Sequence, residues 1–181
     1  MQKISQILLR LMGWKYEALT PDFDKCILLV APHTSNWDFL MGKIGYTAMG
    51  RNANFVIKRE WLVWPVGILF KKLGGIGVDR DKANHFTDQI AEIYRTRDKF
   101  SLAITPEGTR KRNAKWKKGF YHIAMKAQVP IVLVKIDYKE KYMALFEVFT
   151  PTGDEHADIK AIQQKYKGVT GKYPDQFSIG E

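Results

Sequence analysis

Apolar and polar residues alternate in blocks along this chain, and the blocks have the lengths of strands and helices. Short apolar runs typical of buried strands occupy residues 25–31, 54–58, 75–79, 100–104, 131–137 and 142–149. Longer stretches with helical spacing of apolar residues occupy 37–49, 61–72, 84–97, 119–127 and 157–167. This alternation predicts an α/β fold with a largely parallel sheet and helices on both of its faces.

The last two predicted strands differ from this pattern. Only residues 138–141 separate the apolar run 131–137 from the run 142–149. A parallel crossover needs a dozen or more residues, so we expect this C-terminal strand pair to be antiparallel. The chain has 181 residues and shows no linker or repeat. We therefore expect one domain over residues 21–181, preceded by an amphipathic helix within residues 1–20.

Two segments have apolar faces with two alternative explanations. Residues 1–20 contain apolar residues on one helical face, and residues 61–70 are rich in tryptophan and lie between pairs of basic residues. Each face can pack on the sheet, or it can lie in the headgroup layer of a membrane. No stretch reaches the roughly 18 to 20 apolar residues that cross a bilayer. We expect a peripheral protein at the cytoplasmic face of a membrane, anchored through residues 1–20.

The net charge of the chain indicates which classes of partner it can bind. The formal net charge is +10 at pH 7, which indicates an anionic partner: a membrane surface, a phosphorylated substrate or a nucleic acid. The basic loop 105–118 contains Trp116, a residue suited to stacking on bases, but no recognised nucleic-acid motif accompanies it. The single cysteine, Cys26, lies in a predicted strand and suits a reducing compartment. We expect no nucleic-acid partner and no metal site.

The clearest chemical signal is a histidine and an aspartate at the end of a predicted buried strand. His33 lies in the turn after the strand 25–31, and Asp38 is the second residue of the predicted helix 37–49. On a continuous helix, a spacing of five would turn them away from each other. The pair therefore requires the helix to begin between them, with Ser35 or Asn36 as its N-cap. A histidine held by a carboxylate is a candidate general base; the alternative is a surface histidine near a capping aspartate.

Two more polar clusters follow predicted strands. Asp79 ends the strand 75–79 and Arg80 follows it, and a polar loop follows the strand 100–104. The carboxyl ends of parallel strands share one edge of a sheet, so we expect all three clusters to meet in one cleft. In that cleft, Arg110 and Arg80 can each clamp a phosphate through two hydrogen bonds. Each cluster also has a plainer explanation as a turn, an ion pair or a solvated charged surface.

These blocks resemble the 1-acylglycerol-3-phosphate acyltransferase family, within the wider glycerolipid acyltransferases. The matching segments, in the family's order, are His33–Asp38, Gly77–Arg80, Pro106–Arg110 and Val129–Val134. The first is similar to the family's motif of a histidine, four residues and an aspartate. The fourth departs from the family's pattern, which commonly has a second proline at the position of Leu133. The resemblance covers about residues 25–137.

The resemblance implies a reaction and a role for each matching residue. A fatty acyl group would move from acyl-CoA or acyl carrier protein to the hydroxyl of a lysophospholipid, foremost 1-acylglycerol-3-phosphate, giving phosphatidate. His33 would take the hydroxyl proton, and Asp38 would orient the imidazole. The residues expected to bind phosphate and glycerol are Arg80, Glu107, Gly108, Thr109 and Arg110. Glu107 is expected to orient an arginine or a substrate hydroxyl, and no cofactor beyond the thioester co-substrate is implied.

Alternatives to this reaction stay open. The acceptor could be another lysolipid, such as lyso-ornithine lipid, or the dyad could activate water in a hydrolase. A non-catalytic basic protein that binds membranes or nucleic acid would use the charge alone. Within the acyltransferase hypothesis, the segment 61–70 is predicted to form part of the acyl-chain slot. Gly67 would then let a tail lie against the helix, or would merely permit close packing.

Overall fold

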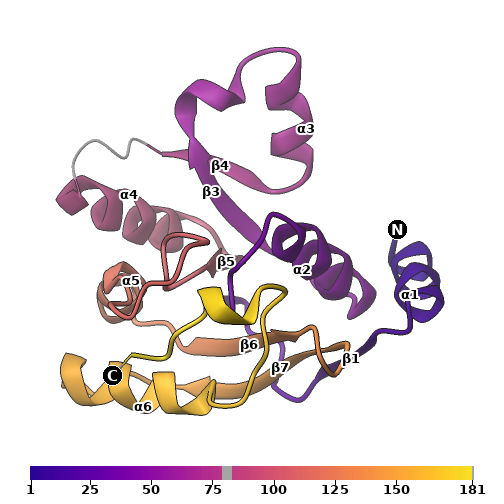
Figure 1. The fold of residues 1–181 in the computed structure, drawn as a ribbon. Coiled ribbons are helices and arrows are strands. Elements are labelled where there is room, and N and C mark those ends of the chain that lie inside the picture. Colours follow the sequence, from indigo (N-terminus) through magenta and orange to yellow (C-terminus); the bar gives the residue numbers. More distant parts are fainter. Residues whose placement is uncertain (79–82, 181) are drawn as a thin grey trace.

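The computed structural model describes residues 1–78 and 83–180, with backbone alone at residues 61, 66 and 83–85 (Figure 1). Its strands form a seven-stranded sheet in the order β1-β7-β6-β2-β5-β3-β4. The strands are β1 (Lys15–Ala18), β2 (Lys25–Ala31), β3 (Asn54–Lys58), β4 (Gly75–Val78), β5 (Phe100–Ile104), β6 (Ile131–Asp137) and β7 (Tyr142–Phe149). The strand pairs are parallel except β6–β7, which is antiparallel. The predicted fold class is confirmed.

Helices cover both faces of the sheet. They are α1 (Gln2–Leu11), α2 (Trp37–Ala48), α3 (Val66–Lys72), α4 (Ala83–Thr96), α5 (Gly119–Ala127) and α6 (Glu155–Lys165). In β2, Ile27 and Leu29 pack with α4, α5 and α6, whereas Leu28 packs on the face that carries α2. All three side chains are buried, which explains why β2 is a continuous apolar run and not an alternating one.

Two elements differ from the sequence predictions. The predicted helix 61–72 is divided into a 3₁₀ turn, Arg59–Leu62, and the short helix α3, with Pro65 at the N-cap of α3. Proline disfavours helical backbone in the residue before it, so a continuous helix cannot pass this point. Strand β1 was not predicted, because Lys15–Ala18 is short and mostly exposed at the edge of the sheet.

The predicted final helix is confirmed, with its start two residues earlier. It spans Glu155–Lys165, and the Asp154 side chain caps it by accepting from the backbone N–H of Ala157 at 3.0 Å. None of the helices in the described part of the chain is long and apolar enough to cross a membrane.

Candidate active site

The site lies where two neighbouring strands end. β2 and β5 pair in parallel, with Leu28 opposite Ala103, so the turn after β2 lies beside the loop after β5. Together they border a pocket of about 690 Å³. Its lining includes the predicted site residues His33, Asp38, Gly108, Thr109 and Arg110. The predicted convergence of these two clusters is therefore observed; Arg80, from the third cluster, lies outside the described residues.

Asp38 is the centre of the hydrogen bonding in this turn. Its Oδ2 accepts the backbone N–H groups of Thr34 and Ser35 at 2.7 and 2.8 Å. Its Oδ1 accepts the hydroxyls of Ser35 and Tyr138 at 2.8 and 2.7 Å. Burial raises the pKa of Asp38, but the nearby imidazole of His33 and the hydrogen bonds from Tyr138 and Ser35 outweigh it, so the net pKa is lowered. The carboxylate is thus held ionised beside the histidine.

His33 faces this carboxylate through one ring nitrogen. Its Nδ1 lies 3.2 Å from Asp38 Oδ2, within ion-pair distance, although the ring N–H is not aligned with that oxygen. Catalytic hydrogen bonds commonly tighten only in the reacting complex. Because Nδ1 faces Asp38, Nε2 is the nitrogen left to exchange a proton with a substrate.

The pair meets because the helix begins between its members, as the spacing required. α2 starts at Trp37 with Asn36 at the N-cap position, yet no side chain caps it there. Asp38 instead reaches back to the amides of the preceding turn. The Asn36 side chain accepts a hydrogen bond from the guanidinium of Arg110, which connects this turn to the loop after β5.

Glu107 lies behind the histidine. Its side chain is 2% exposed, and Oε1 accepts the backbone N–H of His33 at 2.8 Å. We expected Glu107 to orient an arginine or a substrate hydroxyl. Its partner is instead the His33 amide, and its side chain is buried. Burial raises its pKa to about 7, although its own amide, the His33 amide and the imidazole lower it. Glu107 therefore fixes the backbone that carries His33.

The loop after β5 has the conformation that its glycine predicts. Gly108 has φ +64°, and a Cβ there would lie 2.9 Å from Lys117 Cγ, so a larger residue would be strained and crowded. Thr109 Oγ1 accepts the backbone N–H of Lys111 at 3.2 Å. Arg110 is exposed and lines the pocket beside Gly108 and Thr109.

The pocket is apolar below its polar mouth. The apolar lining comes from β2, α2, β3, α4 and β5, and includes Leu28, Val30, Phe39, Phe55, Val56, Phe86, Ala103 and Ile104. No residue of 61–70 belongs to the lining among the described positions. A Cβ on Gly67 would lie 2.2 Å from the carbonyl carbon of Leu62, which favours the close-packing explanation for this glycine. The described part of 61–70 thus lies outside this pocket, whose apolar wall comes from other elements.

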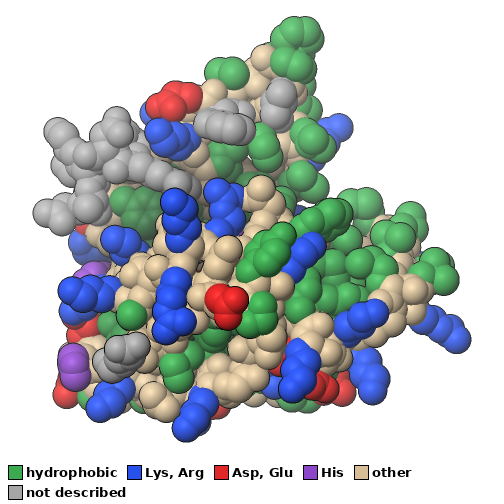
Figure 2. Space-filling view, viewed as in Figure 1, with side chains coloured by type: hydrophobic (Ala, Val, Ile, Leu, Met, Phe, Trp, Pro, Cys, Tyr) green, Lys and Arg blue, Asp and Glu red, His purple; other side chains and the backbone are tan. Residues whose placement is uncertain are grey.

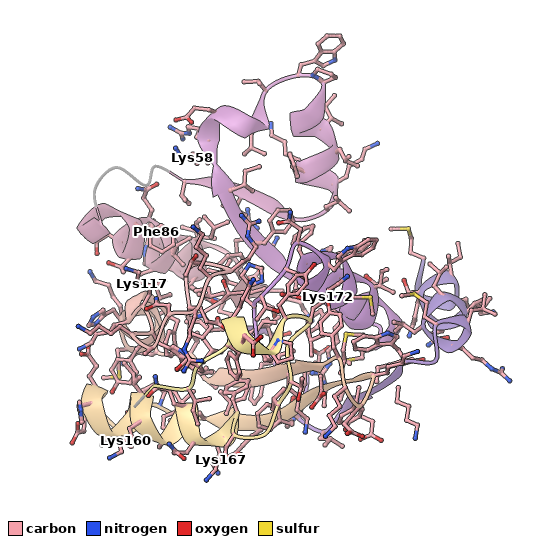
Figure 3. All side chains as sticks on the ribbon, viewed as in Figure 1. Lys58, Phe86, Lys117, Lys160, Lys167 and Lys172 are labelled. Atoms are coloured by element: carbon pink, nitrogen blue, oxygen red, sulfur yellow. The ribbon has the colours of Figure 1, made fainter. Side chains whose placement is uncertain are left out.

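Two contributors to the site carry no local signal in the sequence. Tyr138, in the β6–β7 turn, bonds Asp38 across a separation of 100 residues. The C-terminal segment contacts the turn that carries His33, where Tyr173 N–H donates to Thr34 Oγ1 at 3.2 Å. Lys172 Nζ lies 4.8 Å from the centre of the Trp37 ring, at the start of α2 (Figure 3). Only a pattern of paired substitutions across homologues could have indicated these long-range partners.

Among the side chains that the structure describes, no group of three or more His, Cys, Asp or Glu residues is arranged to hold a metal ion. The site described above is a histidine–aspartate pair beside a pocket with a largely apolar lining, to which Arg110 also contributes.

Comparison with known proteins gives one consistent result. Residues 16–137 match the family model described as Acyltransferase. A 1-acyl-sn-glycerol-3-phosphate acyltransferase from Haemophilus influenzae is 33% identical over 135 residues, covering 68% of this chain and 54% of that protein. The alpha form from Mus musculus is 31% identical, covering 54% of this chain and 37% of that protein. The chain thus spans about half the length of the bacterial relative, and less of the mouse one.

The fold is also similar to that of a protein of known structure. The crystal structure of the 1-acyl-sn-glycerophosphate (LPA) acyltransferase PlsC from Thermotoga maritima aligns with a TM-score of 0.56 at 17% sequence identity. The alignment covers 94% of this chain and 80% of that one. At this identity the likeness establishes the common fold.

Proposed function

Because the chain belongs to the acyltransferase family, we propose that it transfers a fatty acyl group from a thioester to the hydroxyl of 1-acylglycerol-3-phosphate, giving phosphatidate. The observation that carries this proposal is the His33–Asp38 pair at the mouth of an apolar pocket, with Arg110 beside it. The pocket offers a base, a cation and an apolar wall, which are the three features that an acyl transfer to a phospholipid needs.

The reaction follows from the geometry of the dyad. The acceptor hydroxyl attacks the thioester carbonyl while His33 Nε2 takes its proton, and Asp38 stabilises the imidazolium that forms. The tetrahedral intermediate then collapses, the C–S bond breaks, and the imidazolium returns the proton to the departing thiolate. The acceptor oxygen is the nucleophile, so no acyl-enzyme forms. Support comes from the ionised state of Asp38, which favours one orientation of the ring.

The rest of the site suits the two substrates. Arg110, with the backbone around Gly108, is proposed to hold the acceptor phosphate through charge-assisted bonds, and the apolar pocket is proposed to hold an acyl tail. The donor is proposed to be acyl-CoA or acyl carrier protein, both of which carry phosphate. Lys58, Lys117 and Lys172 have no carboxylate partner among the described residues (Figure 3), and they can serve such an anion.

One assay tests the reaction. Purified protein is incubated with labelled acyl thioesters and with 1-acylglycerol-3-phosphate, glycerol 3-phosphate or lyso-ornithine lipid, and the products are identified by mass. We expect phosphatidate. A product only from another lysolipid would change the acceptor, and thioester consumption without any acceptor would show a hydrolase instead.

A membrane surface is the proposed location of this reaction. The outward residues of α1 are strongly exposed, with Leu11 at 80%, and so is Trp64 in the segment before α3, at 82%. Figure 2 shows apolar side chains gathered over α1 and α2 and along the α3 segment, with basic side chains nearby. Exposed apolar residues next to cations suit an anionic bilayer.

Vesicle co-sedimentation tests this location. The double variant Ile7→Glu, Leu11→Glu is compared with Leu19→Glu, an exposed leucine outside α1. We expect the double variant alone to lose binding to anionic vesicles, and salt to weaken binding of the wild type. Equal binding to neutral and anionic vesicles would contradict the electrostatic part of the proposal.

A further inference from the structure

A tyrosine distant in sequence touches the catalytic carboxylate. We infer that Tyr138 is a positioning residue of the dyad, which holds Asp38 toward His33, and that Trp14 holds Tyr138 in turn. This inference rests on the proposed function. It adds a link between the end of α1 and the acid–base pair, through contacts that neither residue's sequence neighbourhood reveals.

The first step is the contact between Tyr138 and Asp38. Among the described donors to Asp38, Thr34 and Ser35 belong to the same turn and would move with it. Tyr138 comes from a different part of the fold, and its hydroxyl donates to Oδ1 at 2.7 Å. This bond therefore ties the turn to the β6–β7 hairpin and fixes the plane of the carboxylate whose other oxygen faces His33.

Tyr138 is suited to be a permanent donor. Its pKa is raised, first by burial and then by the negative charge of Asp38, so the hydroxyl keeps its proton over the working pH range. Its backbone is also fixed, since its N–H donates to the carbonyl of Thr170 at 2.9 Å. A protonated hydroxyl on a held backbone can set the position of the carboxylate.

The second step is the contact between Tyr138 and Trp14. The two rings meet edge to face, with centroids 5.2 Å apart and planes at 90°. Trp14 is buried and packs in one cluster with Leu9 of α1 and Met41 of α2. Two further bonds join the same hairpin to the chain after α1, from Lys141 Nζ to the carbonyl of Met12 and from the Lys15 N–H to the carbonyl of Lys141.

These contacts form a continuous path from α1 to the dyad. α1 lies beside α2 (Figure 1), and α2 carries Asp38. The seating of α1 is thus expected to affect the carboxylate both through α2 and through Trp14 and Tyr138. Since misplacement of a catalytic group by about 1 Å can cost about 100-fold in rate, loss of either aromatic contact is expected to show in turnover.

The test compares two tyrosines of one hairpin. Tyr138→Phe removes the hydroxyl that bonds Asp38, and Tyr142→Phe removes one that bonds the exposed Glu17 at 2.6 Å. We expect Tyr138→Phe to lower kcat by about 10- to 100-fold, with KM for both substrates unchanged and the protein still folded by circular dichroism. Tyr142→Phe should leave kcat unchanged. Equal kcat values for the two variants, or a fall in kcat that accompanies a loss of folding, would overturn the inference.

A second readout does not need turnover. Ring ¹⁵N signals of His33 should move in Tyr138→Phe and, to a smaller extent, in Trp14→Leu, but not in Tyr142→Phe. If Trp14→Leu fails to fold, the comparison of Tyr138→Phe with Tyr142→Phe still tests the inference. Unchanged His33 signals in Tyr138→Phe would overturn the inference even if the wild type were active. Wild-type protein with no transferase activity, but with these shifts, would instead reject the proposed function alone.

Discussion

Glu107 makes the stability of this protein depend on pH in a direction that can be calculated. The carboxyl is buried, one oxygen accepts the His33 amide, and the other, Oε2, has no partner among the described residues. The substitution Glu107→Gln keeps the shape and an acceptor oxygen for His33 while removing the charge. The variant therefore isolates the cost of ionising this group inside the fold.

The direction and the size of this pH dependence follow from the pKa of Glu107. Burial raises the pKa of Glu107 from 4.5 to about 7, which corresponds to about 3 kcal/mol at about 1.4 kcal/mol per factor of ten. The stability that the protonated carboxyl contributes is complete below pH 4.5 and is lost as the pH rises through 7. Glutamine does not ionise, so its contribution to stability does not fall as the pH rises. Relative to wild type, Glu107→Gln should therefore gain about 3 kcal/mol of unfolding free energy between about pH 4.5 and pH 8.

Urea denaturation at several pH values measures this difference. Glu140→Gln, at an exposed position, is the matched control and should track the wild type. A free-energy difference between Glu107→Gln and wild type that stays constant over this pH range would refute the reasoning. It would mean that Glu107 ionises in the fold as easily as in the unfolded chain.

Three other substitutions have defined outcomes. Asp38→Asn keeps an acceptor oxygen for the turn amides, and its NH2 group can donate to the Tyr138 hydroxyl. We therefore expect a folded protein by circular dichroism whose kcat is about 10²–10⁴-fold lower; near-normal turnover would contradict the dyad. Arg110→Gln should raise the acceptor KM by about 10- to 100-fold, from a lost charged bond of roughly 1.5–3 kcal/mol, and a change in the thioester KM alone would reverse the assignment. In Gly67→Ala the new Cβ would lie 2.2 Å from the Leu62 carbonyl carbon. The substitution should therefore lower the free energy of unfolding by about 1–3 kcal/mol and leave the acyl-chain preference unchanged. A stable variant with an altered preference would show that 61–70 contributes to the acyl-chain slot.

The fold was predictable where packing on two faces dictates the sequence. β2 and β6 are buried on both sides, so most of their residues are apolar and each is recognisable as a continuous apolar run. β1 could not be found in this way, because an edge strand with exposed residues, Lys15–Ala18, needs no apolar pattern. The break at Pro65 has a local cause in the sequence, because proline disfavours helical backbone in the residue before it even where the apolar spacing of 61–72 favours one helix.

The site was predictable where neighbours in sequence become neighbours in space. His33 and Asp38 share one turn, and the ends of β2 and β5 meet because parallel strands share an edge. The partner of Glu107 was not predictable, because its bond to the His33 amide depends on how two loops pack. Tyr138 lies 100 residues from Asp38, and no local rule of spacing reaches that far.

The central claim is that His33 is the general base of an acyl transfer to a lysophospholipid, and one rate comparison tests it most directly. Wild type and His33→Ala, matched in circular dichroism, are assayed for phosphatidate formation from an acyl thioester and 1-acylglycerol-3-phosphate. The account predicts measurable turnover by the wild type and a rate about 10²–10⁴-fold lower in the variant. Equal rates in the two proteins would contradict it.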